Sequence, residues 1–159
     1  MELPVRKANR LPEYDYASPG AYFVTICTRD RQCLLSRVTV GADALGGPQL
    51  QLTDEGKIVE RYILSAERMN GFHVDSYVVM PNHVHILLRI DDGPPRASAP
   101  TVSDAVGALK RLVNRSLGRN IWQRSFHEHV IRNANDYREI AEYIDANPAG
   151  WAEDRYYER

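Results

Sequence analysis

The segment over residues 77–90 restricts most strongly what this chain can fold into. It contains two short apolar runs separated by Pro81-Asn82, and a break this short joins two antiparallel strands. Because successive side chains of a strand point to opposite faces, the second run has one apolar and one mixed face. The apolar face consists of Val84, Ile86, Leu88 and Ile90, and the mixed face consists of His83, His85, Leu87 and Arg89. The sequence thus predicts a sheet that carries two imidazoles opposite its apolar face.

Two readings of His83 and His85 are open at this point. Neutral imidazole is the commonest protein ligand for a metal ion, and two imidazoles one residue apart on a strand can share one ion. An isolated pair of this kind is equally compatible with two histidines that form hydrogen bonds with their neighbours on a half-exposed strand.

Composition narrows the class of protein. A chain of 159 residues with 43% hydrophobic and 26% charged residues fits one globular domain over 1–159. The formal net charge of −1 excludes a general basic field, so any binding of nucleic acid must depend on local patches. No apolar run is long enough to cross a membrane, so we expect no membrane partner. Cys27 and Cys33 match no metal or redox spacing and are expected to be reduced thiols in a cytoplasmic protein.

The order of the expected elements predicts the fold class. Strands are expected over 21–28, 72–80, 83–90 and roughly 126–132, and helices over 54–69, 103–117 and 136–146, starting at Thr53, Ser103 and Asp136. Residues 1–20 are read as an extended arm, 91–101 as a loop, and 36–51 as a loop or a short hairpin. This order is the split βαβ pattern of a ferredoxin-like α+β sandwich. It has a four-stranded antiparallel sheet with the first and third strands in the middle and two helices on one face. The third helix is then the element left to cover the histidines.

The third helix carries a tyrosine outside its apolar stripe. At about 100° per residue, its buried stripe consists of Tyr137, Ile140, Ala141 and Ile144. Tyr143 lies roughly 110° from the centre of that stripe, and Asn147 lies one turn further along the same flank. Tyr143 is therefore either an ordinary boundary residue or a nucleophile beside the imidazoles, with Tyr137 as the alternative tyrosine.

A phenol beside a metal ion suits one kind of chemistry. With a pKa of about 10 it is a poor nucleophile alone, but a divalent ion on a phosphate oxygen makes the phosphorus more electrophilic. Attack on a DNA phosphodiester leaves a covalent phosphotyrosine and a free hydroxyl, so strands can be rejoined without ATP. Two histidines and one oxygen ligand favour Mg²⁺ or Mn²⁺ over a closed structural zinc site.

The motifs resemble a known family. Residues 79–86, Val-Met-Pro-Asn-His-Val-His-Ile, resemble the His-hydrophobic-His (HUH) motif of the single-tyrosine transposases of bacterial insertion sequences. The segments 121–132 and 142–148, the pair Asp136-Tyr137, and the segments 14–16 and 22–28 are similar to the REP-associated tyrosine transposase branch. The resemblance runs from about residue 6 to residue 152.

This resemblance implies a metal-dependent transposase that cleaves and rejoins single-stranded DNA next to hairpins in a bacterial, nucleoid-associated setting. It leaves open whether the protein acts as a monomer or as a homodimer. It implies that Tyr143 is the nucleophile, that His83 and His85 bind the metal, and that Asn147 supplies a third ligand. His129 resembles a recurrent position near the site, with a role in DNA contact, water positioning or packing.

Candidate DNA-binding residues are Lys110, Arg111, Arg115, His129 and Arg132. Arg111 and Arg115 lie one turn apart on the second helix and form either a phosphate-tracking ridge or a solvated surface. Two other functions use the same residues. One is a non-catalytic binder of structured nucleic acid, and the other is a metallohydrolase that releases free phosphate ends.

Overall fold

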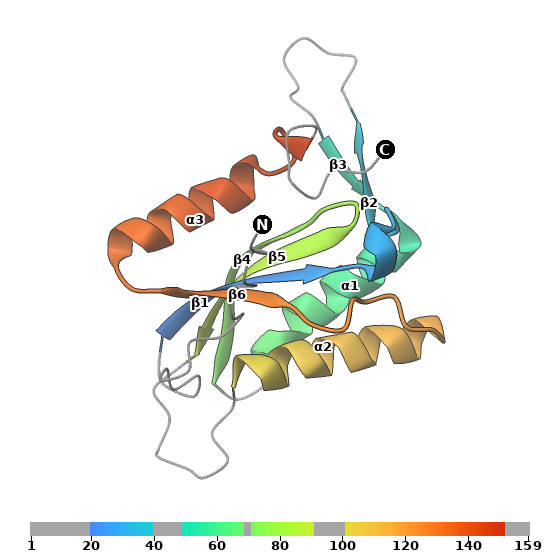
Figure 1. The fold of residues 1–159 in the computed structure, drawn as a ribbon, viewed down its shortest axis with the longest axis horizontal. Coiled ribbons are helices and arrows are strands. Elements are labelled where there is room, and N and C mark those ends of the chain that lie inside the picture. Colours follow the sequence, from blue (N-terminus) through green and yellow to red (C-terminus); the bar gives the residue numbers. More distant parts are fainter. Residues whose placement is uncertain (1–19, 40–48, 69–70, 91–100, 152–159) are drawn as a thin grey trace, which may run out of the picture.

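The sheet has the strand order expected of the split βαβ pattern. The computed structural model describes residues 20–39, 49–68, 71–90 and 101–151 (Figure 1). Its main sheet is antiparallel, with the order β4-β5-β1-β6 and the bounds β1 Gly20–Cys27, β4 Phe72–Val79, β5 His83–Ile90 and β6 His127–Ile131. The first and third of these strands, β1 and β5, are therefore central, as predicted. The expected arm over 1–20 and loop over 91–101 lie outside the described residues, apart from Gly20 and Thr101.

The helices lie in two layers around this sheet. Helices α1 (Asp54–Ser65) and α2 (Val102–Leu117) cover one face, and α3 (Ala134–Ala146) covers the other (Figure 1). This arrangement confirms the predicted ferredoxin-like α+β sandwich. In the described part of the chain, each helix is too short or too polar to cross a membrane.

Two helices begin earlier than predicted. The cap of α2 is Thr101 rather than Ser103, because the Thr101 hydroxyl accepts from the Asp104 backbone N–H while the Asp104 carboxylate accepts from the Thr101 N–H. The cap of α3 is Asn133 rather than Asp136, and its side-chain oxygen accepts from the Asp136 N–H. In both cases the upstream polar residue has the extended backbone that an N-cap requires.

The expected loop over 36–51 contains paired strands. β2 (Ser36–Thr39) and β3 (Gln49–Leu52) form a two-stranded antiparallel sheet, which is the hairpin alternative, and residues 40–48 lie outside the described residues. Val38 and Leu50 are partners across this pair, and both pack against the apolar cluster beneath α3. The hairpin is stabilised by this contact with a distant part of the chain, which the local sequence does not reveal.

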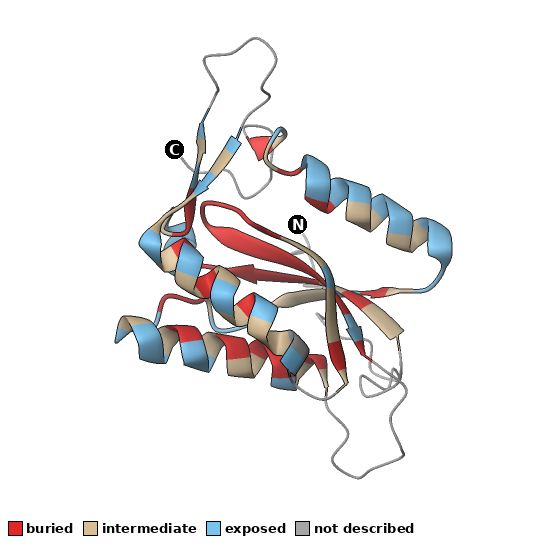
Figure 2. Cartoon of the chain, turned by 180° about the vertical axis from the view of Figure 1, so that it is seen from behind, coloured by how far each residue is buried: buried red, intermediate tan, exposed pale blue. Residues whose placement is uncertain are grey.

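Each face of the sheet has its own apolar cluster. The alternating residues of β5 that face α1 and α2 are Val84, Ile86, Leu88 and Ile90. The cluster on the α3 side is built around Cys27, Val78, Met80, Leu87, Ile144 and Trp151. Figure 2 shows the central strands in red, whereas much of the surface of α3 is exposed. The histidines of β5 therefore lie on the face that α3 covers.

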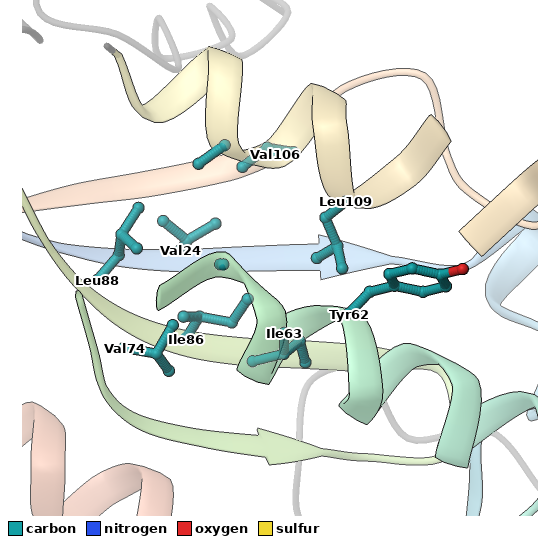
Figure 3. Close-up of a pocket in the computed structure, with 10 residues that line it drawn as sticks. Val24, Tyr62, Ile63, Val74, Ile86, Leu88, Val106 and Leu109 are labelled. Carbon is teal, nitrogen blue, oxygen red and sulfur yellow. The ribbon is translucent and has the colours of Figure 1, made fainter. Parts of the chain in front are cut away.

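An apolar hollow lies on the opposite face, between α1, α2 and the sheet (Figure 3). It offers about 330 Å³ of space, part of which is open solvent. It is lined by Val24, Tyr62, Ile63, Ala66, Val74, Ile86, Leu88, Ala105, Val106 and Leu109. This lining carries no charged side chain to bind a phosphate, so we read the hollow as a gap in core packing.

Tyr77 joins the edge strand β4 to α1, and it makes stability sensitive to high pH. Its hydroxyl donates to Glu60 Oε1 at 2.6 Å, and burial together with this carboxylate raises the pKa of Tyr77 to about 12. The contribution of Tyr77 to stability is complete below its ordinary pKa of 10.0. Above that pH the unfolded chain ionises first, so we expect this contribution to fall and to be lost at about pH 12.

Denaturant titrations between pH 8 and pH 11.5 test this pH dependence, because the free energy of unfolding of Tyr77→Phe is expected to fall less steeply above pH 10. The other tyrosines contribute equally to both proteins. Identical slopes for the two proteins would contradict the assignment.

Candidate active site

His83 and His85 converge on the α3 side of the sheet. Their Nε2 atoms are 3.1 Å apart and their ring centroids 4.6 Å apart. Both side chains are buried, with 0% and 1% of their surface exposed. The strand alternation thus places both rings inside the protein, each with Nε2 directed at the other.

Neighbouring side chains hold the other nitrogen of each ring. His83 Nδ1 lies 2.8 Å from Asn82 Oδ1, and His85 Nδ1 lies 2.8 Å from Thr25 Oγ1 on the adjacent strand β1. The Asn82 amide also donates to the Arg31 carbonyl at 3.4 Å. Partners of this kind orient imidazoles that ligate metals.

Hydrogen bonds also fix the turn that leads into β5. Met80 N–H donates to the His83 carbonyl at 2.8 Å, closing the turn. The Asn82 carbonyl accepts from the backbone N–H and the hydroxyl of Thr28, at 2.9 and 3.1 Å. Leu35 N–H donates to the Pro81 carbonyl at 3.0 Å. The position of His83 therefore depends on contacts with the segment that follows β1.

Helix α3 brings Tyr143 to the same place. Ile144 is buried, and Tyr137, Ile140 and Ala141 pack beside it, as the predicted stripe requires. The Tyr143 ring lies 5.4 Å from the His85 ring and 6.0 Å edge-on from the Phe23 ring. With 44% of its surface exposed, Tyr143 lies beside His85 while remaining open to solvent.

Asn147 lies one helical turn beyond Tyr143 and is 4% exposed. Its amide nitrogen is 3.5 Å from the Tyr143 carbonyl, and its Oδ1 has no hydrogen-bond partner within the described part of the chain. One turn further, Trp151 lies with its ring 6.0 Å from that of His83. Asn147 therefore lies between two residues that contact the histidines. A buried carbonyl oxygen without a hydrogen-bond partner is well suited to act as a ligand of a cation.

The distances fit a divalent ion. Two ligands at a right angle and about 2.1 Å from an octahedral ion lie about 3.0 Å apart, against about 3.4 Å in a tetrahedral site. The histidine Nε2 atoms, 3.1 Å apart, lie between these two values, so both rings can reach one ion with little movement. Among the described residues, no three His, Cys, Asp or Glu side chains are grouped to hold a metal. The Asn147 carboxamide, whose buried Oδ1 has no partner among the described residues, is the candidate for an oxygen ligand.

Both edges of the sheet hold the first turn of α3. Tyr137 Oη donates to Asp75 Oδ2 of β4 at 2.8 Å, and Arg89 pairs with the same carboxylate at 3.2 Å. Burial and then the Asp75 carboxylate raise the pKa of Tyr137. On the other edge, His129 Nε2 of β6 lies 2.9 Å from Asp136 Oδ2. The hydroxyl of Tyr137, the alternative tyrosine, is thus engaged away from the histidines.

The predicted basic ridge lies on the far layer. Arg111 and Arg115 are exposed on α2, which covers the opposite face of the sheet from α3 (Figure 1). Lys110 donates to the carbonyls of Gln123 and Ser125 at 2.9 and 3.1 Å, and burial lowers its pKa. Lys110 thus tethers the segment before β6, and the structure does not bring these three cations to the histidine pair.

Two of the predicted DNA-binding residues lie nearer to α3. His129 is partnered across the sheet with Phe23, which contacts both His85 and Tyr143. Arg132 is exposed in the short connection between β6 and α3. These two residues flank the side of the sheet on which Tyr143 lies.

The chain is similar to known proteins over most of its length. No protein-family model matches the chain. It is 30% identical over 177 aligned positions to an uncharacterised protein of Haemophilus influenzae, covering 96% of this chain and 93% of that one. It is 29% identical over 139 positions to the REP-associated tyrosine transposase of Escherichia coli K12, covering 86% of this chain and 72% of that protein. A solved REP-associated tyrosine transposase bound to a REP hairpin superposes with a TM-score of 0.62 at 28% identity, covering 87% and 73% of the two chains.

This chain belongs to the REP-associated tyrosine transposase family. Membership confirms the resemblance drawn from the motifs at 79–86 and 142–148. It also agrees with the predicted fold class, because the match to the solved transposase extends over most of the chain.

Four residues of the site in this member of the REP-associated tyrosine transposase family were not predicted from the sequence. Thr25 and Asn82 hold the two histidines, and Phe23 and Trp151 lie against their rings. Phe23 and Thr25 are two positions apart on β1, so the sequence predicts that they share a face. Which β1 residue lies opposite His85 depends on the strand register, which local periodicity does not specify.

Proposed function

We propose that this chain is a metal-dependent single-stranded DNA endonuclease and strand transferase that forms a 5′-phosphotyrosine through Tyr143 beside DNA hairpins. The observation that carries the proposal is the position of the Tyr143 ring, 5.4 Å from a histidine pair whose Nε2 atoms converge. A solvent-open phenol beside two buried imidazoles suits phosphoryl transfer better than a structural role does.

In the proposed reaction the Tyr143 hydroxyl attacks a backbone phosphorus. A new bond forms between the phenol oxygen and phosphorus, the bond from phosphorus to the 3′ oxygen breaks, and a free 3′ hydroxyl leaves. The phenol loses one proton and the leaving oxygen gains one. A Mg²⁺ or Mn²⁺ ion held by His83, His85 and Asn147 would neutralise charge on the phosphate. The phosphotyrosine keeps the bond energy needed for rejoining.

Residues around the site have distinct supporting roles in this proposal. Thr25 and Asn82 orient the histidines, and Phe23 orients the Tyr143 ring through an edge-on contact. Tyr143 lies beside the histidines of its own chain, which supports a site that is complete within a monomer. A homodimer stays a prediction.

The nucleic acid is proposed from the relatives and from the distribution of charge. The solved relative is bound to a REP hairpin, and we propose that this chain also binds hairpin DNA. His129 and Arg132 flank the α3 side of the sheet, where the single strand would enter. Arg111 and Arg115 lie on the far layer and would contact duplex phosphates, whereas Lys110 would act by holding the segment before β6.

Incubation with Mn²⁺ and labelled single strands from the flanks of its own gene tests this proposal. We expect a labelled band that survives denaturation and disappears when EDTA is added first. DNA binding that is insensitive to EDTA, with no covalent band under Mg²⁺ or Mn²⁺, would instead establish a non-catalytic binder. Free phosphate ends without trapped protein would establish a metallohydrolase.

A further inference from the structure

A continuous chain of close polar contacts passes through the two histidines. It runs from Thr25 Oγ1 to His85 Nδ1 at 2.8 Å, between the two Nε2 atoms at 3.1 Å, and from His83 Nδ1 to Asn82 Oδ1 at 2.8 Å. It continues from Asn82 Nδ2 to the Arg31 carbonyl at 3.4 Å. This network of contacts therefore connects β1 to the turn before β5 through both imidazoles.

The Arg31 carbonyl fixes the direction of the hydrogen bonds in this network. A backbone carbonyl only accepts, so the Asn82 amide nitrogen faces Arg31 and its oxygen faces His83. His83 Nδ1 must then carry the ring proton, and in a neutral imidazole the Nε2 atom becomes an acceptor. It follows that His85 donates from Nε2, and that His85 Nδ1 accepts from the Thr25 hydroxyl.

Metal binding requires the opposite arrangement at His85. An ion held by both histidines needs the lone pair of each Nε2, so His85 must give up its Nε2 proton and carry one on Nδ1 instead. No net proton is gained or lost. The partner of Nδ1 must then change from a donor into an acceptor, and a hydroxyl can do both because it rotates about its C–O bond.

We propose that Thr25 is the positioning residue that allows His85 to take both tautomers, donating to Nδ1 in the metal-free protein and accepting from it when an ion is bound. The inference rests on the proposed function only in that it assumes a divalent ion at the histidine pair. Thr25 is 4% exposed and His85 1% exposed, so solvent is poorly placed to replace the hydroxyl. His83 needs no such exchange, because Asn82 already favours its Nδ1 proton.

Nitrogen chemical shifts of the imidazole rings test the tautomers directly in the unmodified protein. We expect the His85 proton on Nε2 without metal and on Nδ1 with saturating Mg²⁺, while the His83 proton stays on Nδ1 in both states. A His85 proton that is already on Nδ1 in the metal-free protein, or that stays on Nε2 with Mg²⁺ bound, would overturn the proposal.

Two substitutions test the hydroxyl. Thr25→Val keeps the shape of the side chain and its β-branching but removes the hydroxyl, and the loss of such an orienting partner is expected to weaken Mn²⁺ binding about 10- to 100-fold. Thr25→Ser keeps the hydroxyl and is expected to bind within about 3-fold of the parent. Mn²⁺ titrations followed by electron paramagnetic resonance give these affinities, and thermal unfolding without metal checks the fold. Parent-like Mn²⁺ affinity in folded Thr25→Val would refute the role of Thr25.

The outcomes separate this inference from the proposed function. A protein that binds Mn²⁺ and exchanges the His85 tautomer, yet forms no covalent DNA adduct, would contradict the nuclease proposal alone. A protein that forms the adduct equally well with Thr25→Val, at limiting Mn²⁺, would contradict the Thr25 proposal alone.

Discussion

Replacement of Tyr143 by phenylalanine is expected to abolish the covalent adduct with single-stranded DNA, by at least about 10³-fold, because the variant lacks the attacking oxygen. The remaining ring keeps its contacts with His85 and Phe23, so metal and DNA binding should change little. Denaturing gels quantify the adduct, and filter binding measures the affinity for DNA.

Tyr137→Phe is the matched control for Tyr143→Phe. Both variants remove one hydroxyl from α3, but that of Tyr137 donates to Asp75 on the edge strand. We expect its loss to loosen the first turn of the helix and to leave adduct formation within about 5-fold of the parent, which reflects one exposed hydrogen bond. An adduct that persists in Tyr143→Phe and disappears in Tyr137→Phe would exchange the two assignments.

Among the substitutions proposed for this protein, Gly56→Ala is expected to lower the free energy of unfolding most. A Cβ on Gly56, in the first turn of α1, would lie 1.8 Å from the Leu35 carbonyl oxygen, and backbone on both sides leaves no rotamer to relieve the clash. That oxygen also accepts from the Thr53 N–H at 3.0 Å, and Leu35 N–H donates to Pro81 in the turn before His83. We expect a loss of about 3 kcal/mol or more in the free energy of unfolding, together with weaker Mn²⁺ binding.

Gly107→Ala provides the control for Gly56→Ala. It lies within α2, and its Cβ would meet only the flexible end of the Arg111 side chain, at 3.2 Å. Alanine is favoured over glycine inside a helix, so we expect a gain of up to about 1 kcal/mol. Urea unfolding of both variants measures the difference, and equal stabilities would show that the contact with Leu35 relaxes without cost.

The residues near the histidines show which features of the site can be predicted from the amino-acid sequence. The alternation of β5 assigned His83 and His85 to one face, and the stripe of α3 set Tyr143 apart from Ile144. Both predictions depend on periods of two and 3.6 residues, which backbone geometry imposes on any strand or helix. The order of elements then restricted the fold, because short connections permit few arrangements of a split βαβ unit.

Features that depend on distant contacts needed the tertiary structure. The partner of His85 is set by the register between β1 and β5, and the local sequence of neither strand contains it. The local sequence does not show that Lys110 donates to two backbone carbonyls. Nor does it show that Arg111 and Arg115 lie on the layer opposite α3, because that depends on where α2 packs.

Local sequence patterns therefore specify which side chains share a face and which element must cover the imidazoles. Only the folded chain decided what lies across from those side chains, because register and layer result from packing summed over segments far apart in sequence. Thr25 and Trp151, which meet the histidines from opposite ends of the chain, are products of that packing.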